Sequence, residues 1–205
     1  TAIGNYALDA SNASGCTAVG ANALGASTTG GSNTAVGQTA LGANTTGAEN
    51  TAVGLNALDA ATTVSYNTAI GHAALGANTT GTQNTALGWG AGIGITTGGD
   101  NTAIGSAVMY GGAGVTGANN TAVGREALHT VTTAAANVAI GRSALKADTT
   151  GGYNVAIGFE ALDANTTGTT NIAIGSSSLS ANTTTAGNTA VGKNTLLVAT
   201  AANNT

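Results

Sequence analysis

Apolar and polar residues follow one short pattern that recurs along the whole chain. The pattern is Thr, Val or Ile, then Ala, then Val, Ile or Leu, then Gly, and it begins twelve times. Successive starts are 17 residues apart, except for one interval of 16 residues and one of 19. The starts are residues 1, 17, 34, 51, 68, 85, 102, 121, 138, 155, 172 and 189. Because side chains that alternate with a period of two are typical of strands, each repeat is predicted to begin with a short β-strand.

A fixed period this short predicts a solenoid, in which each repeat forms one coil and stacks on the next. The repeats account for residues 1–205, so we expect one all-β domain: a β-solenoid, or parallel β-roll, of twelve coils. At a strand spacing of about 4.8 Å the rod would be roughly 55 to 60 Å long. No cap is recognisable at Thr1 or Thr205, and we expect the working molecule to continue beyond both.

Positions are counted here from the opening residue of each repeat. Position one exchanges Thr for Val and Ile, as a buried site tolerates, so positions one and three are predicted to face the interior. Position two is always Ala and would then face outward, flat against a neighbouring chain. We therefore expect self-association, as a homotrimer first or by end-to-end stacking. The candidate oligomer interface is Ala35, Ala52, Ala69, Ala103, Ala139 and Ala156.

The rest of each repeat predicts a bend, a second side and a turn. Position four is always Gly, which suits a positive φ or a close approach of two backbones. Four residues later comes Leu, usually preceded by Ala, which we expect to form the second side of the coil. Asn or Asp, a Thr-Thr pair and a closing Asn follow. The aligned closing Asn residues are predicted to hydrogen-bond as a ladder along the rod.

Composition and charge exclude several classes of protein. Charged residues make up only 6% of the chain, with 33 Gly and no Pro, which is far from an average globular domain. The net charge is −4 with four Lys and Arg, so nucleic acid is not expected as a partner. Polar residues interrupt every apolar run before the ~20 residues of a membrane-spanning helix, so no membrane insertion is expected in this segment.

The string Asn-Thr-Ala-Val/Ile-Gly-x-x-Ala-Leu carries a family resemblance. It occurs at residues 33–41, 50–58 and 67–75, and, with Val in place of Thr, at 154–162 and 137–141. It resembles the head repeats of YadA-like trimeric autotransporter adhesins, and it is similar to arrays in tail-fibre-like proteins of bacteriophages, large viruses and bacteria. The resemblance covers essentially the whole chain. It implies a trimeric, left-handed parallel β-roll exposed outside a cell or on a virion, with a role in attachment.

Position five is the candidate recognition surface, because it varies most in chemistry. It contains the only Trp and the only Phe of the chain, a His and three of the four cations. Aromatic faces beside polar groups are suited to sugar rings or protein receptors. The candidate binding residues are His72, Trp89, Arg125, Arg142 and Phe159. The alternative is that this row is variable surface without a ligand. The 19-residue repeat around residues 110–114, together with Trp89, is a further place to expect a ligand contact or a bend.

Two other functions stay open. Nine repeats carry a Thr-Thr pair, and stacked coils would align these pairs in a ladder that resembles the ice-binding face of β-solenoid antifreeze proteins. A structural filament that stacks end to end is the other alternative.

Catalysis is not predicted. His72 and His129 lie more than three coils apart at different positions, and Cys16 is the only thiol, at a closing-Asn position where we expect it to be free. Asp9, Asp59 and Asp163 share a position but are at least three coils apart, too far to act as a pair. We expect no enzyme activity, no catalytic residue, no metal site and no cofactor.

Overall fold

The computed structural model spans residues 1–205 and describes all of them except 11, 113, 198, 200 and 205. The described residues form twelve strands and no helix. The strands are β1 (Ala2–Ile3), β2 (Thr17–Val19), β3 (Thr34–Val36), β4 (Thr51–Val53), β5 (Thr68–Ile70), β6 (Thr85–Leu87), β7 (Thr102–Ile104), β8 (Thr121–Val123), β9 (Val138–Ile140), β10 (Val155–Ile157), β11 (Ile172–Ile174) and β12 (Thr189–Val191).

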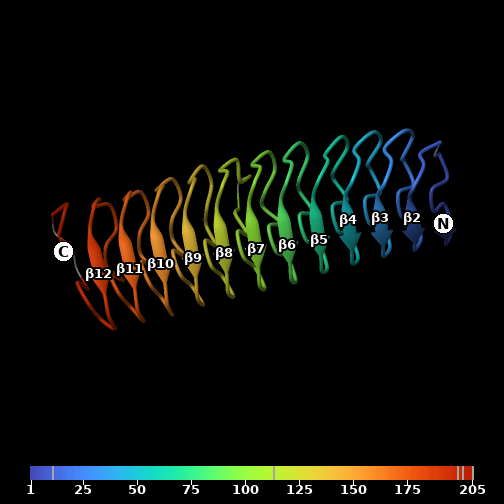
Figure 1. Ribbon diagram of the computed structural model, residues 1–205. Coiled ribbons are helices and arrows are strands. Elements are labelled where there is room, and N and C mark those ends of the chain that lie inside the picture. The colour runs from blue at the N-terminus through green and yellow to red at the C-terminus, as the bar shows by residue number, and fades with distance from the viewer. Residues whose placement is uncertain (11, 113, 198, 200, 205) are drawn as a thin grey trace.

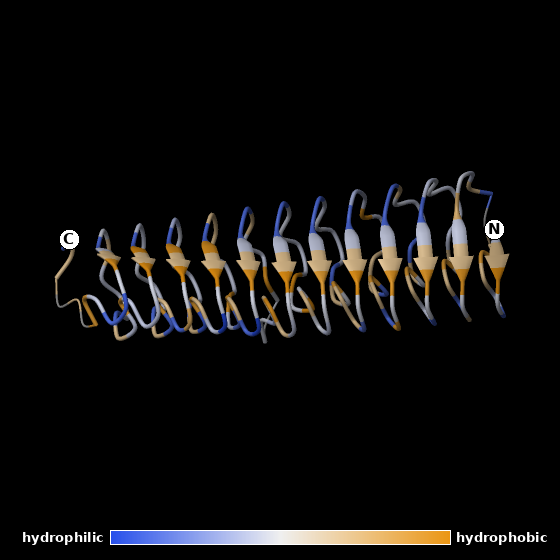
Figure 2. Cartoon of the chain, turned by 60° about the horizontal axis from the view of Figure 1, so that its bottom comes forward, coloured by the Kyte–Doolittle hydropathy of each residue, from blue (hydrophilic) through white to orange (hydrophobic). Residues whose placement is uncertain are grey.

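All twelve strands pair in chain order in one parallel sheet, which confirms the β-solenoid. Equivalent positions of adjacent repeats are partners: Thr34 pairs with Thr51, and Ala35 with Ala52. The repeat with 19 residues keeps this register, since Thr102 pairs with Thr121. Figure 1 shows the resulting rod, with the chain ends at its two ends, and Figure 2 shows the strands side by side along it.

The predicted ladder of closing Asn residues runs inside the rod. Asn50 is buried, and its backbone N–H and its Nδ2 both donate to Oδ1 of Asn33, at 2.9 and 3.0 Å. The same Nδ2 also donates to the carbonyl of Val64 at 2.8 Å. The arrangement recurs up to Asn204, which donates to Asn188 in the same way. Each buried amide group is thereby satisfied by the neighbouring coil, as a buried polar row requires.

Position four is closed to any side chain. The twelve glycines there have φ between 123° and 138°. A Cβ atom on Gly71 would lie 2.3 Å from the carbonyl oxygen of Gly88 in the next coil. Both parts of the prediction for this position, a positive φ and a close backbone approach, are confirmed.

The predicted orientation of the strands is wrong. Position two faces the interior: Ala35, Ala52, Ala69, Ala103, Ala139 and Ala156 are fully buried within the single chain. These alanines therefore cannot form an oligomer interface. Positions one and three face outward, and their side chains are partly or largely exposed. Ala is constant because it lies in the narrow interior opposite the second side of the coil, where a larger side chain has no room.

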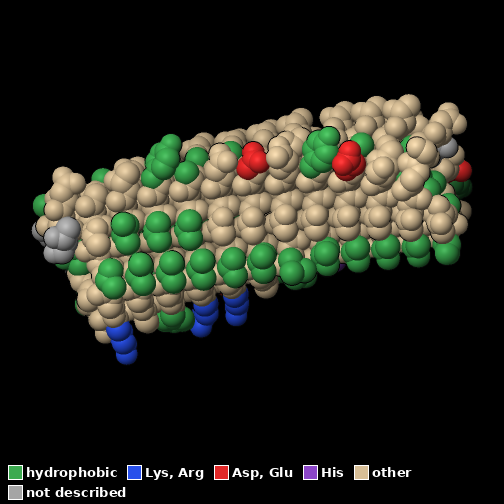
Figure 3. All heavy atoms as spheres, in the orientation of Figure 1, with side chains coloured by type: hydrophobic (Ala, Val, Ile, Leu, Met, Phe, Trp, Pro, Cys, Tyr) green, Lys and Arg blue, Asp and Glu red, His purple; other side chains and the backbone are tan. Residues whose placement is uncertain are grey.

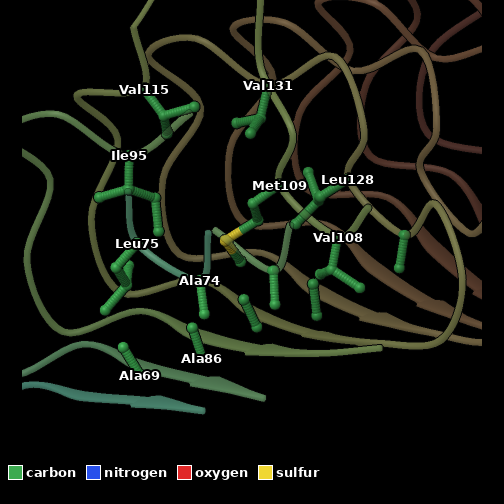
Figure 4. Packing of buried hydrophobic residues seen from close by; sticks show 14 of the residues in the cluster. Ala69, Ala74, Leu75, Ala86, Ile95, Val108, Met109, Val115, Leu128 and Val131 are labelled. Carbon is green, nitrogen blue, oxygen red and sulfur yellow. The ribbon is translucent and has the colours of Figure 1, made fainter. Parts of the chain in front are cut away.

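The core consists of Ala and Leu rows from the two sides of the coil. Leu41, Leu58 and Leu75 have φ near 51°, and each donates its N–H to a carbonyl of the next coil. Gly92 takes the place of this Leu in the sixth repeat. Its absent Cβ would lie 3.1 Å from the side chain of Ile95, which fills the space beside Leu75. Figure 4 shows Ile95, Val115 and Val131 packed with Met109 and Leu128 in this middle part of the rod.

Candidate functional site

The position-five row lies on the surface, directly after the bend at Gly. Trp89 is 53% exposed and Phe159 is 42% exposed. The five candidate binding residues of this row do not form one continuous site. The structure divides the five predicted residues among a stack of rings, a cation–π pair and a group of ion pairs.

Four aromatic rings form a stack along the rod, here called the aromatic ladder: His72, Trp89, Tyr110 and His129. The ring planes of neighbours differ by only 5°, 19° and 2°, with centroid separations of 6.4, 6.2 and 5.4 Å. These separations exceed the ~4.8 Å rise between coils, so each ring is offset sideways from the next. Part of each ring face is therefore left uncovered.

The other predicted residues lie on the eighth to tenth coils. The Arg142 guanidinium lies over the Phe159 ring, 5.4 Å from its centroid. Arg125 and Lys146 both bind Glu126, at 3.0 and 2.8 Å. The Lys146 ammonium, which donates a hydrogen bond, lowers the pKa of the Glu126 carboxyl. Arg125 thus has a partner on its own coil and does not join the ladder.

Sequence reasoning missed Tyr110 and His129 as site residues. Both are at position nine, whereas His72 and Trp89 are at position five. His72 and His129 are far apart in the sequence, yet they lie at the two ends of one stack. The only signal in the sequence was the 19-residue repeat, which drew attention to residues 110–114 and to Trp89 but not to His129.

A hollow of about 280 Å³ adjoins the ladder in the 19-residue repeat, here called the Tyr110 hollow. Its lining is formed by Ala77, Ile93, Gly94, Thr96, Tyr110, Gly111, Gly112 and Gly114. Tyr110 therefore belongs both to the ladder and to the hollow. The 19-residue repeat thus forms a surface depression, and the ligand contact or bend expected there stays a prediction.

A larger groove of about 500 Å³ lies over the first four coils. It is lined by Tyr6, Asp9, Asn22, Gly25, Thr39, Gly42, Ala43 and Asp59. Asp9 and Asp59 lie three coils apart, with Gly25 and Gly42 at the same position between them. Burial raises the pKa of the Asp59 carboxyl. The two acids are too distant to act on one atom, as expected from their spacing.

The Thr-Thr pairs align as predicted, but their first hydroxyls are engaged. Thr28 Oγ1 donates to the carbonyl of Thr45 at 3.0 Å, and Thr45 Oγ1 donates to Thr62 at 2.9 Å. Thr149 and Thr166 repeat the contact at 3.0 Å. These hydroxyls hold adjacent coils together and are only partly available to an external surface.

The outward side of the strands, positions one and three, is here called the strand face. Position three forms a row of aliphatic side chains that Figure 3 shows running along the rod, with Lys and Arg only at its edge. Leu87 is 45% exposed there. Among the described residues, none of the position-one Thr hydroxyls makes a hydrogen bond within the chain.

The described part of the chain lacks both a cluster of metal-ligating residues and a membrane-spanning helix. It contains no group of three or more His, Cys, Asp or Glu residues that could hold a metal ion. It also contains no helix long and apolar enough to cross a bilayer. Cys16 is free and buried, and its Sγ lies 3.4 Å from the carbonyl of Gly30.

Comparisons of the chain with protein-family models, with curated proteins and with solved structures find no match. The resemblance to adhesin and tail-fibre repeats therefore stays a prediction, as does the absence of enzyme activity. A function is therefore proposed from the surfaces described above.

Proposed function

We propose that this chain is a rigid segment of an attachment fibre exposed on a cell surface or a virion. In this proposal copies of the chain associate side by side as a homotrimer, and the position-five row is presented to a glycan or a host-surface receptor. The observation that supports it is the strand face, a straight, uncharged surface with an unbroken aliphatic row.

The size of the strand face favours a partner. Two outward positions across twelve strands give a planar area of roughly 350 to 400 Å². The largest apolar patch on a typical monomer is about 300 to 600 Å² and is often functional. This area is about half of the ~800 Å² per partner that a stable interface buries, so a stable contact requires the flanking rows as well. Position five lies beyond the bend at Gly and stays at the rim, where it can bind a receptor.

A substitution on the strand face tests this assembly. Leu87→Lys places a charge in the aliphatic row, and Leu55→Lys is the matched control, because Leu55 is also a surface leucine, 42% exposed, but is at position five. We expect light scattering to give about three times 19.2 kDa for the wild type and for Leu55→Lys, and one chain mass for Leu87→Lys. A wild-type mass of 19.2 kDa would contradict the proposal.

Ice binding is the second candidate, and we propose the strand face for it in place of the Thr-Thr pairs. The position-one Thr hydroxyls are unbonded within the described chain and repeat every ~4.8 Å along the first eight coils of a flat face, whereas the Thr-Thr hydroxyls bind carbonyls. Thr85→Lys alters the strand face, and Thr80→Lys, which is also exposed, alters only the Thr-Thr corner. If this candidate is right, the wild type is a monomer with thermal hysteresis that Thr85→Lys abolishes and Thr80→Lys preserves.

A further inference from the structure

The Tyr110 hollow has a neutral lining with one aromatic wall. None of its lining residues is Asp, Glu, Lys, Arg or His. Its side-chain hydrogen-bonding groups are the hydroxyls of Tyr110 and Thr96, and its glycines expose little but backbone. A charged ligand would find no counterion there, so the lining favours a neutral ligand that has both an apolar face and hydroxyl groups.

The wall of this hollow is held in place from both sides. Tyr110 is stacked between Trp89 and His129, at 6.2 and 5.4 Å between ring centroids. Its ring edge also lies over Gly90, where an added Cβ would be 3.5 Å from Cε2. A ring fixed in this way loses little conformational freedom when a ligand binds.

The floor of the hollow is formed largely by glycines, which have no side chains to fill it. A Cβ atom on Gly94 would lie 2.3 Å from the carbonyl oxygen of Tyr110, so only Gly fits there. Gly112 differs, because a Cβ atom added to it would meet nothing within 4 Å. The depression is therefore built into the 19-residue repeat, and one of its residues can be enlarged without disturbing the fold.

We propose that the Tyr110 hollow binds a single neutral sugar ring, with Tyr110 as its aromatic wall and Trp89 stacked against that wall. This rests on the proposed attachment function, for which it names the ligand class. The volume of about 280 Å³ lies just below the range of about 300 to 1,000 Å³ of small-molecule sites, which suits one ring rather than an oligosaccharide. A pyranose ring offers C–H groups to the aromatic wall and hydroxyls to Thr96 and the glycine backbone.

The only Trp of the chain provides the measurement, since Trp89 is stacked on Tyr110, the aromatic wall of the hollow. The purified chain is titrated with the methyl glycosides of glucose, galactose and mannose and with N-acetylglucosamine, and sialic acid serves as the charged comparator. We expect at least one neutral sugar to change the Trp89 fluorescence and to give a saturation-transfer NMR signal, with a Kd on the order of 1 mM.

Two variants assign the signal to the hollow. Gly112→Leu fills the hollow and leaves the ladder intact, and we expect at least tenfold weaker binding. Thr133→Leu adds a similar apolar side chain at an exposed position of the next coil, outside the hollow, and should bind like the wild type. Unfolding of each variant at the wild-type temperature shows that the rod is unaffected.

Three outcomes overturn the inference. They are no response to any neutral sugar, equal binding by Gly112→Leu, and binding of sialic acid as strong as that of the neutral sugars. A chain that forms trimers but binds no sugar would remove this inference alone. A chain that binds sugar through the hollow but stays monomeric would remove only the proposed assembly.

Discussion

At the scale of single residues, one buried carboxylate differs from its counterparts in other coils. Position eleven is Asn44 in the third repeat, where the side chain accepts from the N–H of Gly47 and donates to its carbonyl. Asp148 has this position in the ninth repeat. Its Oδ1 accepts from the N–H of Gly151 at 3.0 Å and from Nδ2 of Asn165 at 3.2 Å. Burial raises the pKa of Asp148 to about 7, from 3.8.

This pKa predicts how stability depends on pH. The folded chain holds the Asp148 proton more tightly than the unfolded chain does, so the stability contribution is complete below pH 3.8 and is lost as the pH rises to about 7. Over that range the free energy of unfolding is expected to fall by at most about 4 kcal/mol.

Asp148→Asn removes the charge and restores the amide that Asn44 has at this position. The variant should be more stable than the wild type at pH 8 and should lose most of the dependence between pH 4 and pH 7. Urea unfolding at pH 4, 6 and 8 measures both effects, with Asp9→Asn as an exposed control. Equal pH dependence in Asp148→Asn and the wild type would show that another group is responsible.

At the scale of one strand and its bend, the glycine at position four sets how closely coils stack. Gly71→Ala would place Cβ 2.3 Å from the Gly88 carbonyl at a φ of 134°, which neither backbone can avoid. We expect a loss of at least about 3 kcal/mol in the free energy of unfolding, or failure to fold.

Gly112→Ala is the control for this loss, because it meets nothing within 4 Å and should change stability by less than about 0.5 kcal/mol. Denaturant midpoints of the two variants compare them directly. A Gly71→Ala chain as stable as Gly112→Ala would mean that adjacent coils can separate locally without cost.

The strands also show what the sequence could and could not predict. The repeat period predicted where every strand begins and which residues pair, because equivalent residues of stacked coils must lie side by side. The orientation failed because Thr, Val and Ile are favoured on the exposed face of a sheet as well as in a core. The sequence also did not indicate that Tyr110 at position nine and Trp89 at position five would stack. That contact depends on how the bend folds back, which the repeat spacing does not encode.

At the scale of the whole molecule, charge and chemistry are unevenly distributed along the rod. Residues 1–120 contain four acids and no Lys or Arg, while the remaining coils contain four acids and all four cations. The Tyr110 hollow lies in the first region, and the aromatic ladder extends from the first region to His129 in the second. The solenoid and its uniform register were predictable from the repeat, but the surfaces were not, because they arise from single substitutions in individual coils.

The unbroken register of the sheet makes the plain 17-residue coils interchangeable with one another. Adding or removing one such unit would lengthen or shorten the rod by about 4.8 Å and leave the strand pairing of the remaining coils in register. The length of the rod can therefore change without altering its surface chemistry. Duplication of plain coils would also shift a coil that has a binding feature to a different position along the rod.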